Sequence, residues 1–206
     1  MLSVNDLACV RGDRRLFAGL AFTLEPHTWI YLTGENGVGK TSLLRMLVGL
    51  APAEAGEILW QGQEIKKLGD DYQRAVTYLG HHNAIKEELT ARENIRVGAA
   101  LSGIALSDQQ ADAILVRLGL AGREELSVRF LSQGQKRRVA LARLLWSEAP
   151  LWVLDEPFVA LDTAAIGWLA KTLAEHLAKG GMAILTSHQE VLIEGNIAKQ
   201  LRLTRS

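Results

Sequence analysis

The chain has 206 residues, with 23 basic and 23 acidic side chains and therefore no formal net charge. Its hydrophobic content of 48% and charged content of 22% are those of a globular protein and exclude disorder for most of the chain. The longest stretches without a charged residue, 75–85 and 97–107, are about half the length of a membrane-spanning helix, and Cys9 has no second cysteine to pair with. We expect a soluble cytoplasmic chain without an overall attraction for nucleic acid.

Short apolar runs alternate along the chain with segments of helical period, which is typical of an α/β fold. Strands are expected at 29–32, 56–60, 75–80, 151–154 and 182–186. Capping boxes that begin at Thr90 and Ser107 predict two helices between residues 90 and 120, and further helices are expected after 34–39, from Ser132, and from Asp162 to Gly180. Because helices dominate about 83–147, we predict one domain, 1–206, that carries a helical insert there.

Residues 34–41, Gly-Glu-Asn-Gly-Val-Gly-Lys-Thr, match the phosphate-loop pattern G-x-x-x-x-G-K-[ST] and lie between an expected strand and an expected helix. Glycines let backbone N–H groups approach phosphate oxygens, and the start of the helix adds unpaired donors. Lys40 can reach the β- and γ-phosphates, and the Thr41 hydroxyl can ligate Mg²⁺. The predicted nucleotide-binding residues are Gly34, Glu35, Asn36, Gly37, Val38, Gly39, Lys40, Thr41 and Ser42.

Two carboxylates, Asp155 and Glu156, follow the apolar run 151–154. The carboxyl end of a buried parallel strand opens onto the ligand crevice of an α/β sheet. We expect Asp155 to belong to the Mg²⁺ site and Glu156 to act as the general base, or to position the attacking water, beside the γ-phosphate. The alternative is a solvated turn before Pro157.

Residues 131–135 separate this sequence from other nucleoside-triphosphate enzymes. They are Leu131, Ser132, Gln133, Gly134 and Gln135, and they resemble LSGGQ, the signature motif of ATP-binding cassette (ABC) ATPases, with Gln133 in place of the first glycine. Ser132 is also typical of an ordinary helix N-cap, and the N-terminus of the helix that it caps can bind an anion. In this family the motif covers the γ-phosphate of ATP bound by a second copy, so the resemblance implies an ATP-sandwich homodimer.

The resemblance covers nearly the whole chain. It implies an α/β P-loop NTPase fold of the ABC type, with a RecA-like core, an antiparallel β subdomain and a helical subdomain. Asp162, in Ala-Leu-Asp, is similar to the loop that carries contacts between the two cassettes. His188, in Thr-Ser-His, resembles the switch histidine that contacts the γ-phosphate and is the second catalytic candidate.

The sequence departs from the family pattern after the strand expected at 75–80. His81 and His82 stand where these ATPases usually have a glutamine that senses Mg²⁺ and touches the membrane partner. We interpret the two histidines as coupling residues, although a metal or haem ligand is the alternative.

A second departure lies near the N-terminus, where Arg11 precedes Gly12 in place of the usual aromatic residue. The planar guanidinium of Arg11 can stack on adenine in the same way. Alternatively Arg11 is a solvated turn residue, and Arg14 or Arg15 serves instead.

The basic residues after the signature motif have a simpler interpretation. We expect Lys136, Arg137, Arg138 and Arg143 to form a solvated helix face rather than a nucleic-acid patch.

Several segments are similar to one subfamily, the haem exporter ATPases of cytochrome c maturation: 9–11, 60–62, 79–86, 88–94, 137–143 and 183–189. This similarity implies a peripheral ATPase on the cytoplasmic face of the bacterial inner membrane, bound to integral-membrane permease subunits and without a nucleic-acid partner. The alternatives are the ATPase of another small ABC transporter, a soluble ABC ATPase acting on ribosomes or DNA, and a small-molecule phosphotransferase, for which the signature motif has no use.

Overall fold

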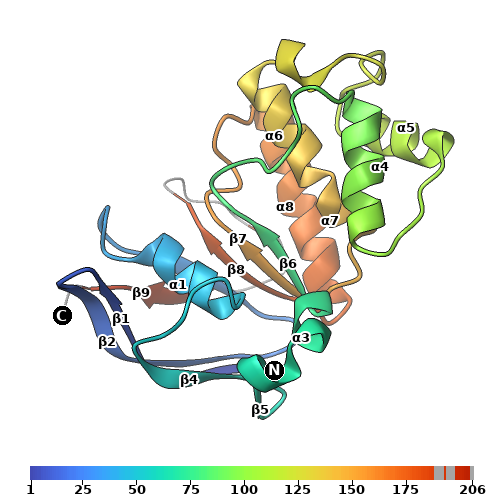
Figure 1. The fold of residues 1–206 in the computed structure, drawn as a ribbon. Coiled ribbons are helices and arrows are strands. Elements are labelled where there is room, and N and C mark those ends of the chain that lie inside the picture. Colours follow the sequence, from blue (N-terminus) through green and yellow to red (C-terminus); the bar gives the residue numbers. More distant parts are fainter. Residues whose placement is uncertain (188–192, 194–197, 205–206) are drawn as a thin grey trace.

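A computed structural model describes residues 1–187, 193 and 198–204, and it contains two sheets (Figure 1). The antiparallel sheet has the order β2-β1-β4-β5 and consists of β1 (Leu2–Arg11), β2 (Arg14–Leu24), β4 (Ala55–Trp60) and β5 (Gln63–Glu64). The parallel sheet has the order β6-β7-β8-β3-β9 and consists of β3 (Trp29–Thr33), β6 (Val76–Leu79), β7 (Leu151–Leu154), β8 (Met182–Thr186) and β9 (Ala198–Arg202). The five strands expected from the sequence are all present.

The helices are α1 (Lys40–Leu47), α2 (Ile65–Leu68), α3 (Asp70–Arg74), α4 (Ala91–Leu101), α5 (Asp108–Arg117), α6 (Gln133–Leu141), α7 (Arg143–Trp146) and α8 (Thr163–Ala178), with a 3₁₀ turn at Val128–Phe130. Helices α1, α4, α5, α6 and α8 begin close to the positions that the sequence predicts, whereas the short helices α2, α3 and α7 were not predicted. Both predicted capping boxes are confirmed, since Thr90 pairs with Glu93 and Ser107 with Gln110. No helix in the described residues is long and apolar enough to cross a bilayer.

The parallel sheet is covered on both faces. All residues of β7 and β8 are buried, as expected for strands between two layers. The apolar side of α1 packs between the two sheets, and α8 covers the opposite face of the parallel sheet (Figure 1). The phosphate loop, which joins β3 to α1, therefore lies between two rigid elements.

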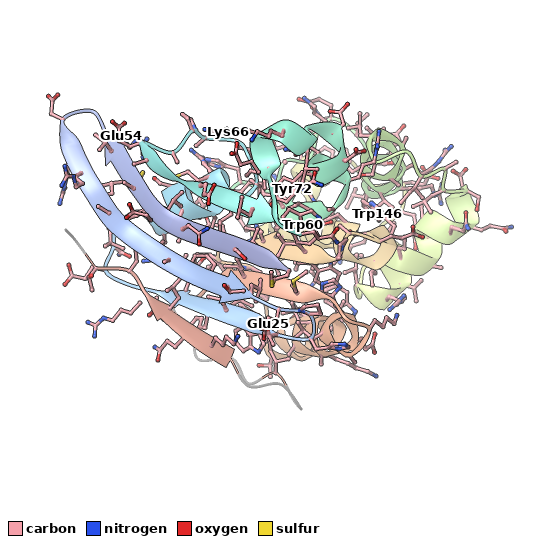
Figure 2. The ribbon with its side chains drawn as sticks, turned by 90° about the horizontal axis from the view of Figure 1, so that it is seen from below. Glu25, Glu54, Trp60, Lys66, Tyr72 and Trp146 are labelled. Carbon is pink, nitrogen blue, oxygen red and sulfur yellow. The ribbon has the colours of Figure 1, made fainter. Side chains whose placement is uncertain are left out.

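The antiparallel sheet is fixed to the core by aromatic side chains. Trp60 of β4 packs against Tyr72 of α3 with ring centroids 5.8 Å apart, and the Tyr72 hydroxyl donates to the Leu47 carbonyl at the end of α1 (Figure 2). This packing holds the first two strands beside the phosphate loop.

Helices α4 to α7 lie between β6 and β7 in the chain and have a core of their own. Ile95, Leu115, Leu118 and Val139 belong to this buried cluster. Figure 1 shows α4 and α5 on the outer side of α6 and α7. Helix α6 thus lies between the outer helices and the parallel sheet, so a residue on α6 can contact both.

Candidate active site

A cleft of about 500 Å³ opens where the phosphate loop meets the ends of the parallel strands. Asp155 and Glu156, directly after β7, form part of its wall. The predicted nucleotide-binding residues that line it are Asn36, Gly37, Gly39, Lys40, Thr41 and Ser42. Val38 points elsewhere, since it is buried in the core.

Two glycines of the loop are required by its shape. Gly34 and Gly39 have φ angles of 146° and 112°, which side-chain-bearing residues rarely adopt. A Cβ at position 34 would lie 2.6 Å from the Leu203 carbonyl oxygen, and one at position 39 would lie 3.2 Å from the Phe17 ring. The loop is therefore in close contact with the Leu203 backbone at Gly34 and with the Phe17 ring at Gly39. The Lys40 ammonium donates to the Gly34 carbonyl oxygen at 2.7 Å, across the loop.

Hydroxyl groups hold the Asp155 carboxylate and the backbone of Glu156, directly after β7. Asp155 accepts from the Thr41 hydroxyl at 2.8 Å and from the Thr186 hydroxyl at 2.9 Å. The Thr186 oxygen in turn accepts from the Glu156 N–H at 2.8 Å. Asp155 and Glu156 are 2% and 9% exposed, which rules out the solvated turn considered from the sequence. A buried carboxylate pair beside a phosphate loop can bind a cation and activate water.

Thr186 belongs to the site, although no role for its side chain was predicted from the sequence. It is fully buried at the end of β8, and its single hydroxyl joins both carboxylate residues. Its position at the end of an expected strand could have indicated this contact, because the carboxyl ends of neighbouring parallel strands meet at one edge of the sheet.

The interpretation of the basic residues on α6 and α7 as a solvated face is wrong. Lys136 and Arg137 are 8% and 4% exposed, and Lys136 is paired with Glu87. Arg137 and Arg143 donate to backbone carbonyl oxygens of the core. A helical face shared with Ala140 and Leu144, at spacings of three and seven residues, was the signal that Arg137 is buried.

The signature segment begins α6. The Ser132 hydroxyl accepts from the Gln135 N–H, and the Gln135 side chain accepts from the Ser132 N–H, which completes a capping box. A Cβ on Gly134 would lie 2.6 Å from the Ala160 carbonyl oxygen, so glycine is needed here for close packing. None of residues 131–135 lines the cleft described above.

Asp162, the predicted contact residue between cassettes, has a local role in this structure. Its side chain accepts from the Ala165 N–H at 2.9 Å and so caps α8, and it is paired with Arg138 of α6. The loop after the two carboxylates is therefore fixed to the signature helix from two sides, by Asp162 and by Ala160.

Arg11 and Arg14 both line the cleft from the hairpin between β1 and β2, and His81 lines it from the segment after β6. The rings of His81 and His82 meet edge to face with centroids 5.6 Å apart. Among the residues that the structure describes, no group of three or more His, Cys, Asp or Glu side chains could hold a metal ion. His188 lies outside the described residues.

Residues 17–159, more than half of the chain, match the family model of the ABC transporter. The chain belongs to the ABC transporter family. It is 58% identical, over 98% of its length and 100% of the relative's, to the cytochrome c biogenesis ATP-binding export protein CcmA of Dechloromonas aromatica (strain RCB). It is also similar to the solved ATP-binding subunit of an ABC transporter, with a TM-score of 0.86 and 27% identity over 98% of this chain and 85% of that one.

A third similarity concerns the fold alone. A dimeric post-hydrolysis state of an ATP-binding cassette, bound to ADP and Pi, has a TM-score of 0.80 at 20% identity and covers 92% of this chain and 88% of that one. The expected P-loop fold of the ABC type is confirmed by the parallel core sheet, the antiparallel sheet and the helices α4 to α7. This ABC ATPase binds and hydrolyses ATP.

Proposed function

We propose that this ABC ATPase powers a membrane transporter that handles haem for the biogenesis of c-type cytochromes. The full-length similarity to the curated CcmA protein supports the substrate class. The buried Asp155 and Glu156 in the phosphate-loop cleft, with the Asp155 carboxylate and the Glu156 backbone N–H both bonded to the Thr186 hydroxyl, support the chemistry, and this is the observation that carries the proposal. The chain would lie on the cytoplasmic face of the bacterial inner membrane, attached to its permease rather than inserted.

In the proposed mechanism the phosphates of ATP lie on the loop amides and at the start of α1, with Lys40 beside the β- and γ-phosphates. Thr41 and Asp155 present two oxygen donors 2.8 Å apart, the ligand type that Mg²⁺ prefers, so the site fits this ion. When bound there, Mg²⁺ would neutralise charge on the phosphates.

Glu156 is the proposed general base for the attacking water. Its buried carboxylate lies in the cleft wall, and the Thr186 hydroxyl fixes its backbone N–H. On the strength of the family resemblance we assign the contact with the γ-phosphate to His188.

Two copies are needed for a complete site in this proposal. Residues 131–135 do not line the cleft of their own chain; Leu131 is buried in the core of the helical part, and residues 132–135 are available to a second chain. Ser132 and Gln133 are exposed, and Ser132 begins a helix whose N-terminus favours anions. Ser132 to Gln135 would therefore cover the γ-phosphate of the partner, with the buried Leu131 anchoring the segment and Asp162 close to the same interface.

The permease is proposed to dock beside the segment after β6. A groove of about 980 Å³ lies there between β6 and the helices, and its walls include Ala84 of that segment, Leu101 of α4 and Trp146 of α7. Leu101 is 85% exposed, a large apolar side chain suited to a protein partner. His81 and His82 precede Ala84 in the chain, so we assign them the coupling between this groove and the nucleotide cleft.

The test uses two variants with opposite effects. Glu156→Gln should retain ATP and accumulate a nucleotide-bound dimer while hydrolysis is lost, because the carboxamide cannot accept the proton of water. Lys40→Ala should lose affinity for ATP, which equilibrium binding measures. Equal turnover by Glu156→Gln and the wild type would refute the assignment of Glu156.

The substrate class is tested in cells. Cells that carry only Glu156→Gln should lack haem-stained c-type cytochromes, and pull-down from native membranes should recover permease subunits with the wild-type chain. Normal c-type cytochromes in these cells would indicate a different ABC transporter.

A further inference from the structure

Arg137 connects three parts of the molecule through one buried side chain. Its Nη2 donates to the carbonyl oxygens of Asp155 at 3.0 Å and of Glu156 at 2.8 Å. Its Nη1 donates to the Gly80 carbonyl oxygen at 3.2 Å and to Asn83 Oδ1 at 3.0 Å. The planar fork of a guanidinium suits this arrangement, because its donors point in fixed directions.

The backbone that Arg137 holds is strained. Glu156 has a φ of 50°, a left-handed conformation that costs a residue other than glycine about 1–3 kcal/mol. Such a conformation persists only where the surroundings enforce it. Thr186 holds the N–H of Glu156, and Arg137 holds its carbonyl oxygen, so the peptide groups on both sides of its Cα are fixed.

Arg137 lies on the helix that starts at the signature segment. Five residues separate it from Ser132, which corresponds to about 7.5 Å along the α6 axis. A helix is rigid over this length, so a shift of Ser132 and Gly134 must displace Arg137, unless the hydrogen bonds of Arg137 break.

Burial strengthens the hydrogen bonds that Arg137 makes. Arg137 is 4% exposed, and its pKa is lowered to about 10, mainly by burial. The nearby charge of Arg143 also lowers this pKa, whereas the charges of Asp155 and Glu156 raise it. The guanidinium therefore remains charged at neutral pH. Hydrogen bonds from a buried cation to carbonyl oxygens are among the stronger ones in proteins.

We propose that Arg137 is a positioning residue that couples the signature helix to the catalytic carboxylate of its own chain. The inference rests on the proposed function of Glu156 and of the two-chain site. When the signature segment engages nucleotide on the partner, α6 is fixed, and Arg137 then holds Glu156 and the 80–83 segment in their active positions. Hydrolysis in one site thus depends on the occupation of the other through a contact inside one chain.

The first test separates turnover from binding in the full-length protein. Arg137→Gln should lower kcat by at least about tenfold, because small misplacements of a reacting group have effects of this size, while the Kd for ATP stays unchanged. Arg137→Lys should recover part of kcat, since it keeps a charged donor. Arg143→Gln is the matched control: Arg143 is half-buried and binds the Tyr78 and Asn83 carbonyl oxygens, but its hydrogen bonds include neither Asp155 nor Glu156. Its effect on kcat should be much smaller.

The second test uses mixed dimers that carry two different affinity tags. One dimer combines an Arg137→Gln chain with a Glu156→Gln chain, so that the only intact Glu156 lies beside the altered Arg137. The other combines a chain that carries both substitutions with a wild-type chain, so that the altered chain supplies only its signature segment. The first dimer should lose hydrolysis, and the second should match a control dimer of one Glu156→Gln chain and one wild-type chain.

The outcomes are distinct. Equal losses in both dimers, or a loss of ATP affinity that parallels the loss of kcat, would show that Arg137 only stabilises the helix and would overturn the inference. If Arg137→Gln does not fold, as judged by circular dichroism, Arg137→Lys takes its place in the same dimers. Failure of the proposed function gives another result, because the control dimer would then hydrolyse ATP as fast as the wild type.

Discussion

Substitution of Thr186 by valine isolates the hydroxyl that joins the two carboxylate residues. Valine has nearly the same shape, so the fully buried position stays filled and no cavity forms. Two hydrogen bonds are lost: one that Thr186 donates to Asp155 Oδ1 and one that it accepts from the Glu156 N–H.

The magnitude follows from what remains unpaired. A hydrogen bond to a charged group contributes about 1.5–3 kcal/mol, and a buried N–H left without a partner costs about 1–3 kcal/mol. We expect Thr186→Val to lower the free energy of unfolding by roughly 3 kcal/mol or more. Hydrolysis should fall as well, because the hydrogen bond that fixes the Glu156 N–H is lost while the one from Arg137 to its carbonyl oxygen remains.

Thr172→Val is the matched control. Thr172 is also buried, at 7% exposure, but its hydroxyl donates only to the Trp168 carbonyl oxygen within α8. That carbonyl keeps its helical partner after the substitution, so the loss should stay below about 1 kcal/mol. Urea denaturation of both variants, with single-turnover hydrolysis, measures the difference. Equal losses of stability with full activity in both variants would refute the reasoning.

The other predictions concern separate regions. If Arg11 stacks on adenine, Arg11→Ala should weaken ATP binding several-fold, Arg11→Tyr should restore it, and GTP should bind within about tenfold of ATP in fluorescence titrations; unchanged affinity of the alanine variant would exclude the stacking. Gly134→Ala should destabilise the protein by forcing its Cβ against the Ala160 carbonyl, whereas Gly167→Ala, in open space on α8, should stabilise it by about 0.5–1 kcal/mol in thermal unfolding. Burial lowers the pKa of His176, so its neutral form is favoured in the folded state; stability should be full above pH of about 6.5 and fall as the pH is lowered toward the folded-state pKa, and His176→Gln should reduce this slope in urea titrations at pH 7.5 and 5.5.

Sequence by itself determined the features that depend on local chemistry. The strands at 151–154 and 182–186 were predictable because a strand buried on both faces must be continuously apolar. The helix starts at Thr90 and Ser107 were predictable because a capping box is completed within four residues. The phosphate loop belongs to the same class, since its glycines, lysine and threonine are contiguous.

Only the tertiary structure decided which residues distant in the chain hold the backbone of Glu156 in place. Thr186 and Arg137 are 30 and 19 residues from Glu156 in the chain, yet both hold its backbone, because the parallel order of β7 and β8 and the packing of α6 bring them together. Charge on a helix normally indicates solvent exposure, so the burial of Arg137 became clear only once its carbonyl partners were placed around it. A buried charge is stable only where the fold supplies such partners, and their positions follow from the whole chain rather than from any segment.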